Sequence, residues 1–251
     1  MRPPLARTLL RLFTVQGSWN YERMLGIGFG VAEEPLLRDL EGGQQREEKG
    51  TPYRMALARG ARFFNAHPYF CGLAVGAAAR AEHDGASPEQ VERLRTALCG
   101  PLGSLGDRLV WAGWLPVTSG LALAGVALGL GWWAIFGFFV LYNAGHLSLR
   151  WWALRAGWAH GLRVADALRQ PLVQRAGALV GPAMAVAMGA ALPLAAGYLG
   201  GPPFSRRAQT LLAVVAVGGF LLLRWRWLGL TGLRLGLGAI ALGLAVGWTW
   251  R

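Results

Sequence analysis

Residues 109–128 read LVWAGWLPVTSGLALAGVAL and contain no charged side chain. A helix needs roughly 20 consecutive apolar residues to cross the hydrocarbon core of a bilayer. This stretch has that length, and only one proline, one threonine and one serine interrupt its apolar and glycine residues. It therefore predicts a membrane-spanning helix. Because only helices and closed barrels can cross lipid, it also favours an all-α fold for its neighbours.

Further along the chain, other stretches repeat this pattern. They are residues 132–149, 176–199, 208–223 and 235–250, of which the last two are short for a span. We expect an all-α integral membrane protein with about five transmembrane helices, since each stretch approaches the length that a bilayer requires.

Charge is distributed unevenly along the 251 residues, 54% of which are hydrophobic and 15% charged. Soluble domains average about 25% charged residues. Of the formal charge of +12, residues 108–251 carry +11 and residues 1–107 carry +1. Arginines scattered between apolar runs indicate membrane topology, whereas a nucleic-acid groove needs them gathered on one folded face. We therefore expect no nucleic-acid partner.

The positions of the arginines predict an orientation. Eight of the twelve arginines in residues 108–251 fall in two groups, between the second and third spans (residues 150–175) and between the fourth and fifth (residues 224–234). Arginine and lysine concentrate in cytoplasmic loops. The chain is therefore predicted to lie in the cytoplasmic membrane with its first hundred residues on the cytoplasmic side and Arg251 on the other side.

The chain before the first span has a different character. We divide it into residues 1–107, an interfacial region with amphipathic and re-entrant helices, and residues 108–251, the transmembrane region. Apolar residues at helical spacing over 5–13, with arginines between them, predict a helix on the membrane surface. A polar, glycine-rich stretch at 41–52 predicts a loop, and residues 53–64 predict a helix that ends before a His-Pro bond.

Local signals in the same region predict a helix start and a packing surface. Ser87, Pro88 and Gln90 form the pattern of a capping box with proline in the first helical position. Gly26 and Gly30 are four residues apart, which is the spacing of close helix packing.

Enzyme and metal motifs do not match. Two cysteines, Cys71 and Cys99, have neither disulfide-framework nor metal-site spacing and are expected to be small core residues. No phosphate-binding loop, hydrolase or dinucleotide-binding pattern is present. We expect no catalytic residues, no metal and no cofactor.

Hydrogen-bonding side chains gather in three stretches, 16–30, 63–72 and 99–111, together with aromatic rings or with glycine and proline, which are expected to break helices. Broken segments beside a binding site are common in transporters. Amides and carboxylates can pair with the hydroxyls of a sugar while rings cover its C–H face. The candidates for a sugar path are Gln16, Asn20, Glu22, Asn65, His67, Glu82 and Asp107.

Other roles are open for several of these residues. Asn65 is suited to capping the turn before Pro68. Glu22 and Arg23 suit an interfacial ion pair. His67 could accept a phosphoryl group or carry a proton, but it has no acid beside it in the sequence to orient it, which favours a structural role.

Together, these stretches resemble the IID component of the mannose/fructose/sorbose family of the sugar phosphotransferase system. The resemblance rests on FTVQGSWNYERMLGIGFGVAEEPLL (13–37), RFFNAHPYFCGLAVGAAARAE (62–82), LRTALCGPLGSLGDRLVWAGWLPV (94–117) and FFVLYNAGHLSLRWWALRAGWAHGLRVADAL (138–168). They follow the family's order.

That resemblance implies a hexose-type permease subunit. A IID component pairs with a IIC membrane subunit, and the pairs assemble into a larger, threefold complex. Cytoplasmic IIA and IIB partners deliver the phosphoryl group, and the membrane subunits are not phosphorylated, which lowers the expectation of a phosphoryl role for His67. The polar stretches would then lie at the sugar path or at the contact with IIC.

Two departures from the family leave an alternative open. The segment after the third span shrinks to GYLGGPPFSRRAQ and has no acid, and the acidic pair after the His-Pro motif keeps only Glu82. The alternative is a divergent scaffold or regulator that does not transport but still binds a IIC-like protein.

Overall fold

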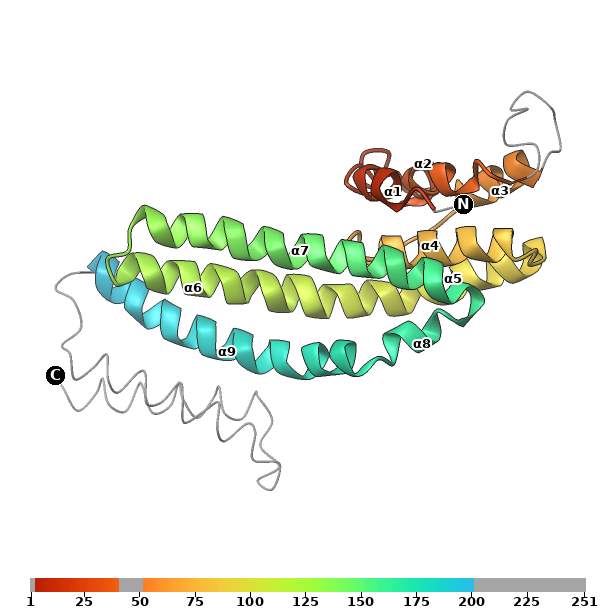
Figure 1. The fold of residues 1–251 in the computed structure, drawn as a ribbon. Helices are drawn as coiled ribbons and strands as arrows, with labels where there is room; N and C mark the ends of the chain where they lie inside the picture. Colours follow the sequence, from red (N-terminus) through yellow and green to blue (C-terminus); the bar gives the residue numbers. More distant parts are fainter. Residues whose placement is uncertain (1–2, 41–51, 201–251) are drawn as a thin grey trace, which may run out of the picture. The chain divides into compact units, whose positions relative to one another are not determined.

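The computed structural model describes residues 3–40 and 52–200 (Figure 1). Within these ranges the chain is helical, without strands, and its β pairing consists of isolated bridges of Met24 with Asn20 and with Phe64. The elements are α1 (Leu5–Leu12), α2 (Gly26–Leu37), α3 (Pro52–Gly60), α4 (Cys71–His83), α5 (Pro88–Gly106), the π-helix η1 (Asp107–Trp114), α6 (Leu115–Ala127), α7 (Trp132–His160), the 3-10 helix η2 (Gly161–Arg163), α8 (Ala165–Leu168) and α9 (Pro171–Gly200). The predicted spans 208–223 and 235–250, and residues 41–51 of the predicted loop, lie outside the described residues.

The helices form two compact units. Within the described residues, unit 1 comprises 3–40, 52–109 and 143–175, and unit 2 comprises 110–142 and 176–200. The boundaries fall within η1, α7 and α9.

Unit 1 is built around α4, whose residues 71–79 are all buried. This helix packs against α1, α2, α5 and η2. Its alanines and glycines let other helices approach closely, since a Cβ on Gly76 would lie 2.6 Å from the carbonyl oxygen of Leu154 in α7. Gly157 of α7 makes the reciprocal approach to the α4 backbone at Leu73 and Ala77. Small residues therefore set the α4–α7 crossing.

The glycines of α2 have the packing role that their spacing predicts. A Cβ on Gly26 would overlap the carbonyl of Arg62, and a Cβ on Gly30 would lie 3.1 Å from the amide nitrogen of Ala61. Gly28, which lies between them, is pressed in the same way against the carbonyl of Val15. The prediction of close packing for this stretch is confirmed.

The capping box at the start of α5 is also confirmed. Ser87 Oγ accepts from the Gln90 backbone N–H at 3.3 Å, and the Gln90 side chain accepts from the Ser87 N–H at 2.8 Å. Pro88 occupies the first turn, where its missing N–H removes no helical bond.

The prediction that residues 99–111 break the helix is wrong. Helical structure runs without interruption from Pro88 to Ala127, through Pro101 and the three glycines of residues 99–111, and it widens into the π-helix η1. The reason is tertiary packing: Val91, Leu98, Leu102 and Gly106 lie on one face of α5 and are buried. Burial of such a stripe outweighs the weak intrinsic preferences of glycine and proline.

Two further helix boundaries differ from the sequence prediction. The helix predicted to run to Phe64 ends at Gly60, because the Phe64 backbone bonds to the chain at the start of α2: its N–H donates to Arg23 and its carbonyl accepts from Leu25. The helix predicted over 132–149 begins at Trp132 as expected but continues to His160.

Unit 2 contains α6, the first half of α7 and most of α9. The backbone of Ala187 in α9 leaves no room for a side chain at Gly120, and Gly125 packs against Ala134 in α7. The turn between α6 and α7 places Gly129 and Gly131 at φ of 91° and 53°, a region that glycine adopts readily.

Within the described residues, two helices are long and apolar enough to cross a membrane, Pro88–Ala127 and Pro171–Leu192. They contain the predicted span 109–128 up to Ala127 and most of the predicted span 176–199, while α7 is not one of the two. The number of spans therefore stays a prediction.

Candidate functional site

The first polar stretch forms a tight turn after α1. Asn20 organises it: its Oδ1 accepts from the backbone N–H groups of Glu22 and Arg23 at 3.1 and 2.9 Å, and its Nδ2 donates to the Ser18 carbonyl at 3.1 Å. Asparagine commonly bonds to backbone groups two or three residues ahead in this way. Gln16 and Glu22 are exposed on the same turn.

The turn lies beside the second polar stretch. Met24, with a φ of 50°, bridges to Phe64. Asn65 follows directly and is exposed. The structure thus brings the backbone around Asn20 next to the segment that carries Asn65 and His67.

Glu82 does not join these residues. It forms an ion pair with Arg59 inside unit 1. Arg59 Nη2 donates to both Glu82 oxygens at 2.6 and 2.7 Å, and its Nε donates to Oε1 at 2.9 Å. Both side chains are only about a tenth exposed, at 11% for Arg59 and 9% for Glu82. The Glu82 carboxylate is therefore bound within the fold.

His67 is buried at the junction between α5 and the π-helix. A Cβ on Gly106 would overlap its side chain, and its Nδ1 accepts from the Tyr69 backbone N–H at 3.2 Å. Burial lowers the pKa of His67 to about 4, while the neighbouring Asp107 carboxylate raises it and Arg150 lowers it further. The ring is therefore neutral at physiological pH. Asp107 itself is exposed at the first residue of η1.

Aromatic and cationic side chains continue from His67 toward α7. Tyr69 stacks on His146, with ring centroids 4.8 Å apart and an interplanar angle of 23°, and it meets His67 edge-on at 5.0 Å. The Arg150 guanidinium lies 4.5 Å from the centroid of the Tyr69 ring. We call His67, Tyr69, Asp107, His146 and Arg150 the His67 cluster.

Arg150 also ties this cluster to α1. It is 5% exposed, and its Nη1 donates to the Leu12 carbonyl at 2.7 Å, at the carbonyl end of α1 where a cation is favourable. Its guanidinium also lies 5.1 Å from the Phe13 ring. One residue thus holds α1, the 67–70 turn and α7 together.

Tyr69, His146 and Arg150 were not among the sequence candidates. The signal that could have found two of them is helical spacing, because His146 and Arg150 are four residues apart and Asn143 is three before His146. Three polar residues on one face of an apolar helix indicate a buried polar contact or a path through the membrane.

The candidates therefore separate into three groups. His67 and Asp107 come together at the α5–η1 junction, and Asn20, Glu22 and Gln16 share the turn that lies beside the Asn65 segment. Glu82 belongs to the ion pair with Arg59.

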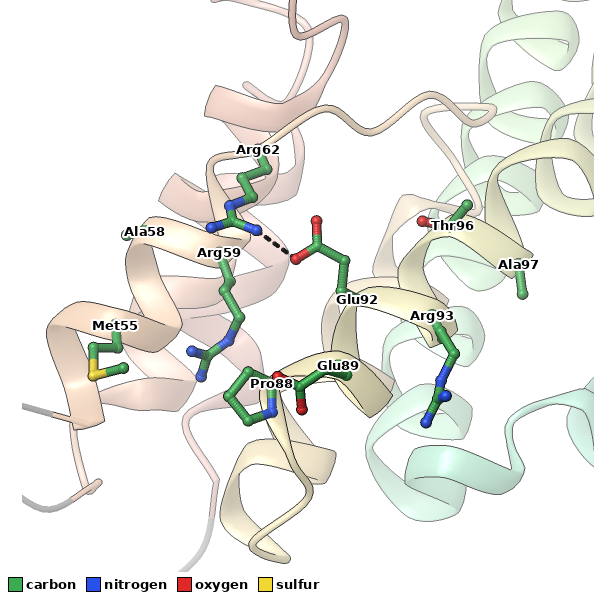
Figure 2. A pocket seen from close by; sticks show the side chains of 10 residues that line it. All are labelled: Met55, Ala58, Arg59, Arg62, Pro88, Glu89, Glu92, Arg93, Thr96 and Ala97. Carbon is green, nitrogen blue, oxygen red and sulfur yellow. Dashed lines mark hydrogen bonds and ion pairs between the residues drawn. The ribbon is translucent and has the colours of Figure 1, made fainter.

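Two cavities lie away from the His67 cluster. One, of about 920 Å³, runs between α3 and α5 and is crossed by an exposed ion pair between Arg62 and Glu92 at 2.5 Å (Figure 2). The other, of about 180 Å³, is bordered by Arg80, Asp84, His160 and Arg163. Within the described residues no group of three or more histidine, cysteine, aspartate or glutamate side chains could hold a metal ion.

The chemistry available at the His67 cluster is that of binding. It offers a neutral imidazole, a tyrosine ring flanked by a second imidazole and a guanidinium, and an exposed carboxylate at Asp107. Rings and charged hydrogen-bonding groups of this kind suit a polyhydroxylated ligand.

Comparison with protein families identifies the family of this chain. Residues 3–192 match the family described as the PTS system mannose/fructose/sorbose family IID component. The chain belongs to this family. The matched range includes all of the His67 cluster and all seven candidates. The resemblance drawn from the sequence is confirmed.

Individual proteins similar to this chain are EIID components as well. The chain is 32% identical over 165 residues to the sorbose-specific EIID component of Lacticaseibacillus casei, a match that covers 64% of this chain and 56% of that protein. It is 29% identical over 160 residues to the mannose-specific EIID component of Escherichia coli K12, covering 62% and 54%. The chain thus matches about half of the length of these curated relatives.

Two solved structures share the fold. One, described as the structure of a membrane protein, aligns over 98% of this chain and 96% of its own with a TM-score of 0.66. The other is a complex of the mannose transporter ManYZ with microcin E492, with a TM-score of 0.58 over 98% and 95% of the two chains. Both are 21% identical to this chain, so the likeness is one of fold.

Proposed function

We propose that this IID-family chain is the membrane subunit of a mannose-family sugar permease and moves a hexose-type sugar across the cytoplasmic membrane together with a IIC subunit. Cytoplasmic IIA and IIB partners deliver the phosphoryl group, and the chain is not catalytic alone. The observation that carries the proposal is the family match over residues 3–192.

The proposed assembly follows from the same family membership. The chain crosses the membrane several times, its N-terminal helices enter from the cytoplasmic side, and IIC–IID pairs gather in a threefold complex. Support comes from the two helices long and apolar enough to span a bilayer and from the likeness of fold to a chain in a mannose transporter complex.

Within this function we assign the sugar path to the His67 cluster and to the exposed candidates Gln16, Glu22 and Asn65. His67 is neutral and buried, so its role is to position Tyr69 and the helix junction. Asp107 is the group that we expect to accept hydrogen bonds from sugar hydroxyls, because an exposed carboxylate at the mouth of an apolar span is costly unless it serves a ligand or partner.

The test is uptake of labelled hexose in cells that lack their own mannose-type permease. The chain is expressed with matching IIC, IIA and IIB proteins, and assembly is measured by co-purification with IIC in detergent. We expect uptake only when this chain is present. Co-purification with IIC but unchanged uptake without this chain would instead identify a scaffold or regulator.

A further inference from the structure

Glu33 is a buried carboxyl group that none of the functions above uses. It lies on α2, is 2% exposed, and is among the largest fully buried side chains of the protein. α3 presses against it so closely that a Cβ on Gly60 would overlap its Oε2. Within the described part of the chain that oxygen has no hydrogen-bond partner.

Charged groups face Glu33 from three neighbouring helices. They are Arg59 on α3, Glu82 on α4 and Arg95 on α5, with the Cys71 thiol of α4 nearby. Arg59 is bound by Glu82 through three contacts of 2.6 to 2.9 Å, so its guanidinium is already neutralised. Burial raises the pKa of Cys71 to about 12, which keeps that thiol uncharged. Arg95 is thus the cation left for Glu33.

Arg95 is held by aromatic rings rather than by an acid. Its guanidinium lies 4.1 Å from the centroid of Phe29 and 5.6 Å from that of Phe64, and its Nη2 donates to the Arg62 carbonyl at 3.3 Å. The side chain is 4% exposed. Among the described residues its Nη1 has no acceptor, and no ion pair within 4.0 Å joins it to Glu33.

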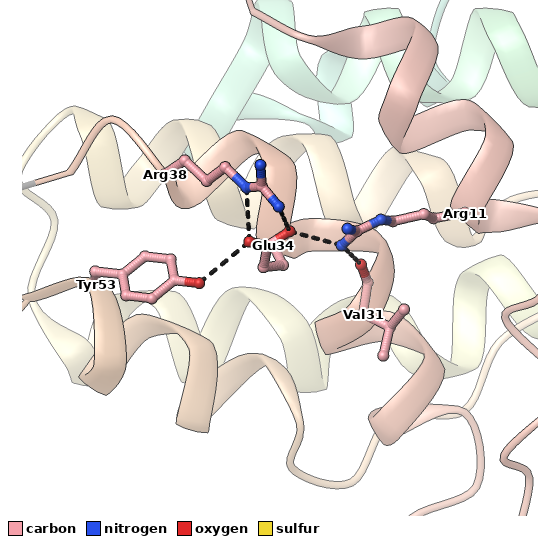
Figure 3. A network of polar contacts seen from close by, with 5 residues as sticks. All are labelled: Arg11, Val31, Glu34, Arg38 and Tyr53. Carbon is pink, nitrogen blue, oxygen red and sulfur yellow. Dashed lines mark hydrogen bonds and ion pairs between the residues drawn. The ribbon is translucent and has the colours of Figure 1, made fainter. Parts of the chain in front are cut away.

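The adjacent residue, Glu34, is an acid whose carboxylate accepts several hydrogen bonds. Glu34 accepts from Arg11 at 2.6 Å, from Arg38 at 2.7 Å and from the Tyr53 hydroxyl at 3.2 Å (Figure 3). Partial burial would raise the pKa of Glu34, but the contacts with Arg38 and Arg11 outweigh it and lower the pKa below its ordinary value. Two consecutive glutamates thus lie in opposite environments, and only Glu34 is built to be ionised.

Electrostatics then favours a proton on Glu33. An unpaired carboxylate in an apolar interior costs several kcal/mol, and a buried acid avoids this by remaining neutral. Burial raises the pKa of Glu33 from 4.5 to about 8; Arg95 and Arg59 oppose the rise and Glu82 adds to it. The neutral acid explains why Arg95 can lie on the rings beside it.

We propose that Glu33 is a proton-binding site whose occupancy is coupled to the position of Arg95. In the protonated state Glu33 carries the O–H, and Arg95 lies on Phe29 and Phe64 as in the structure described here. When the O–H bond breaks, the proton passes to water and the carboxylate keeps the electron pair. The Arg95 guanidinium then leaves the two rings to pair with it.

This movement acts on the segment that leads to the His67 cluster. Phe29 and Phe64 are themselves in contact, with centroids 4.7 Å apart, and Arg95 bonds to the Arg62 carbonyl in the same segment. His67 follows Phe64 by three residues. Release of the proton therefore loosens the contact between α2, the 62–67 segment and α5.

Infrared spectroscopy of the full-length chain in detergent tests the proton directly. The carbonyl stretch of a protonated carboxylic acid is recorded from pH 5 to pH 10. We expect a band at pH 6.5 that is lost in Glu33→Gln and kept in Glu34→Gln, the matched neighbour. Absence of the band at pH 6.5, or its survival in Glu33→Gln, would overturn the proposal.

The coupling is tested by the pH midpoint at which this band disappears. Arg95→Met removes the cation that would pair with the ionised Glu33 carboxylate, so the pH midpoint should rise by at least one unit. Phe29→Leu removes a ring that holds Arg95, which leaves the guanidinium freer to pair with the carboxylate, so the pH midpoint should fall. It also provides a second variant if Arg95→Met does not fold. Arg62→Gln, at an exposed ion pair, should leave it unchanged. An unchanged midpoint in Phe29→Leu, or in folded Arg95→Met, contradicts the coupling.

Discussion

Asn65 and Asp107 are exposed candidates on two segments of unit 1. Asp107→Asn should lower sugar uptake about tenfold or more and Asn65→Ala about twofold to tenfold while assembly with IIC persists, because a hydrogen bond to a charged group contributes about 1.5–3 kcal/mol and a neutral one about 0.5–1.5 kcal/mol. Uptake and co-purification with IIC are measured on the same preparations, with exposed Asp39→Asn as control. Loss of the complex in both variants would assign them structural roles.

His67 gives the protein a pH dependence of its own. Its pKa is about 4 in the folded chain and about 6.5 when unfolded, so the unfolded chain binds more protons between these values. Stability should therefore be full above pH 6.5 and fall toward pH 4, by at most about 1.4 kcal/mol per pH unit.

The check on His67 is unfolding of wild type and His67→Asn over this range. Asparagine keeps an acceptor for the Tyr69 N–H but does not titrate. The variant should lose less stability than wild type as the pH falls from 6.5 to 4. Parallel curves would show that His67 is not the group responsible.

At this scale the sequence identified residue types better than their partners. Asn20, His67 and Glu82 were selected as polar residues in an apolar chain, and all three turned out to bond within the fold. The partners of Asn20 and His67 lie within three residues of them, but Arg59, the partner of Glu82, is 23 residues away. Only the packing of α3 on the core brings such pairs together, and no local pattern reports it.

Among the elements, α7 packs against α4 through a glycine, Gly157. Gly157→Ala should destabilise the protein by about 1–3 kcal/mol, because its Cβ would meet the α4 backbone and force the helices apart. Gly137→Ala is the control in the same helix: its Cβ would meet nothing within 4 Å, so better helix propensity should leave stability equal or higher. Thermal unfolding in detergent measures both; equal effects would contradict the crossing described here.

Element starts were easier to predict than element ends. The capping box of α5 depends on residues within four positions, and the sequence predicted it, as it predicted the start of α7 at Trp132. The continuation of α5 through Pro101 depends instead on burial of Leu98 and Leu102 against other helices. Likewise α3 ends early because Phe64 bonds to the start of α2. Tertiary contacts of this kind are absent from any local window.

For the whole molecule, the arginine pattern predicts a topology. A reporter fused after Arg251 should be active outside the cytoplasm, because both arginine-rich connections are placed on the cytoplasmic side. Paired fusions of alkaline phosphatase and of a fluorescent protein that folds only in the cytoplasm provide the measurement. A fluorescent fusion with an inactive phosphatase would reverse the orientation or change the number of spans.

The family could be identified from the sequence because its polar stretches are long and occur in a fixed order. Which residues line the path could not, since that depends on how helices from residues 13 to 150 meet. The His67 cluster draws on three such segments, the 67–70 turn, η1 and α7, and its α7 members were found only in the structure.

Reconstitution in proteoliposomes tests whether this chain is a transport subunit that works together with IIC. This chain and a matching IIC protein are placed in vesicles, IIA, IIB and a phosphoryl donor are supplied on the cytoplasmic face, and sugar phosphate is measured on that face. We expect sugar phosphate to form only when both membrane proteins are present. Equal formation by IIC alone would contradict it.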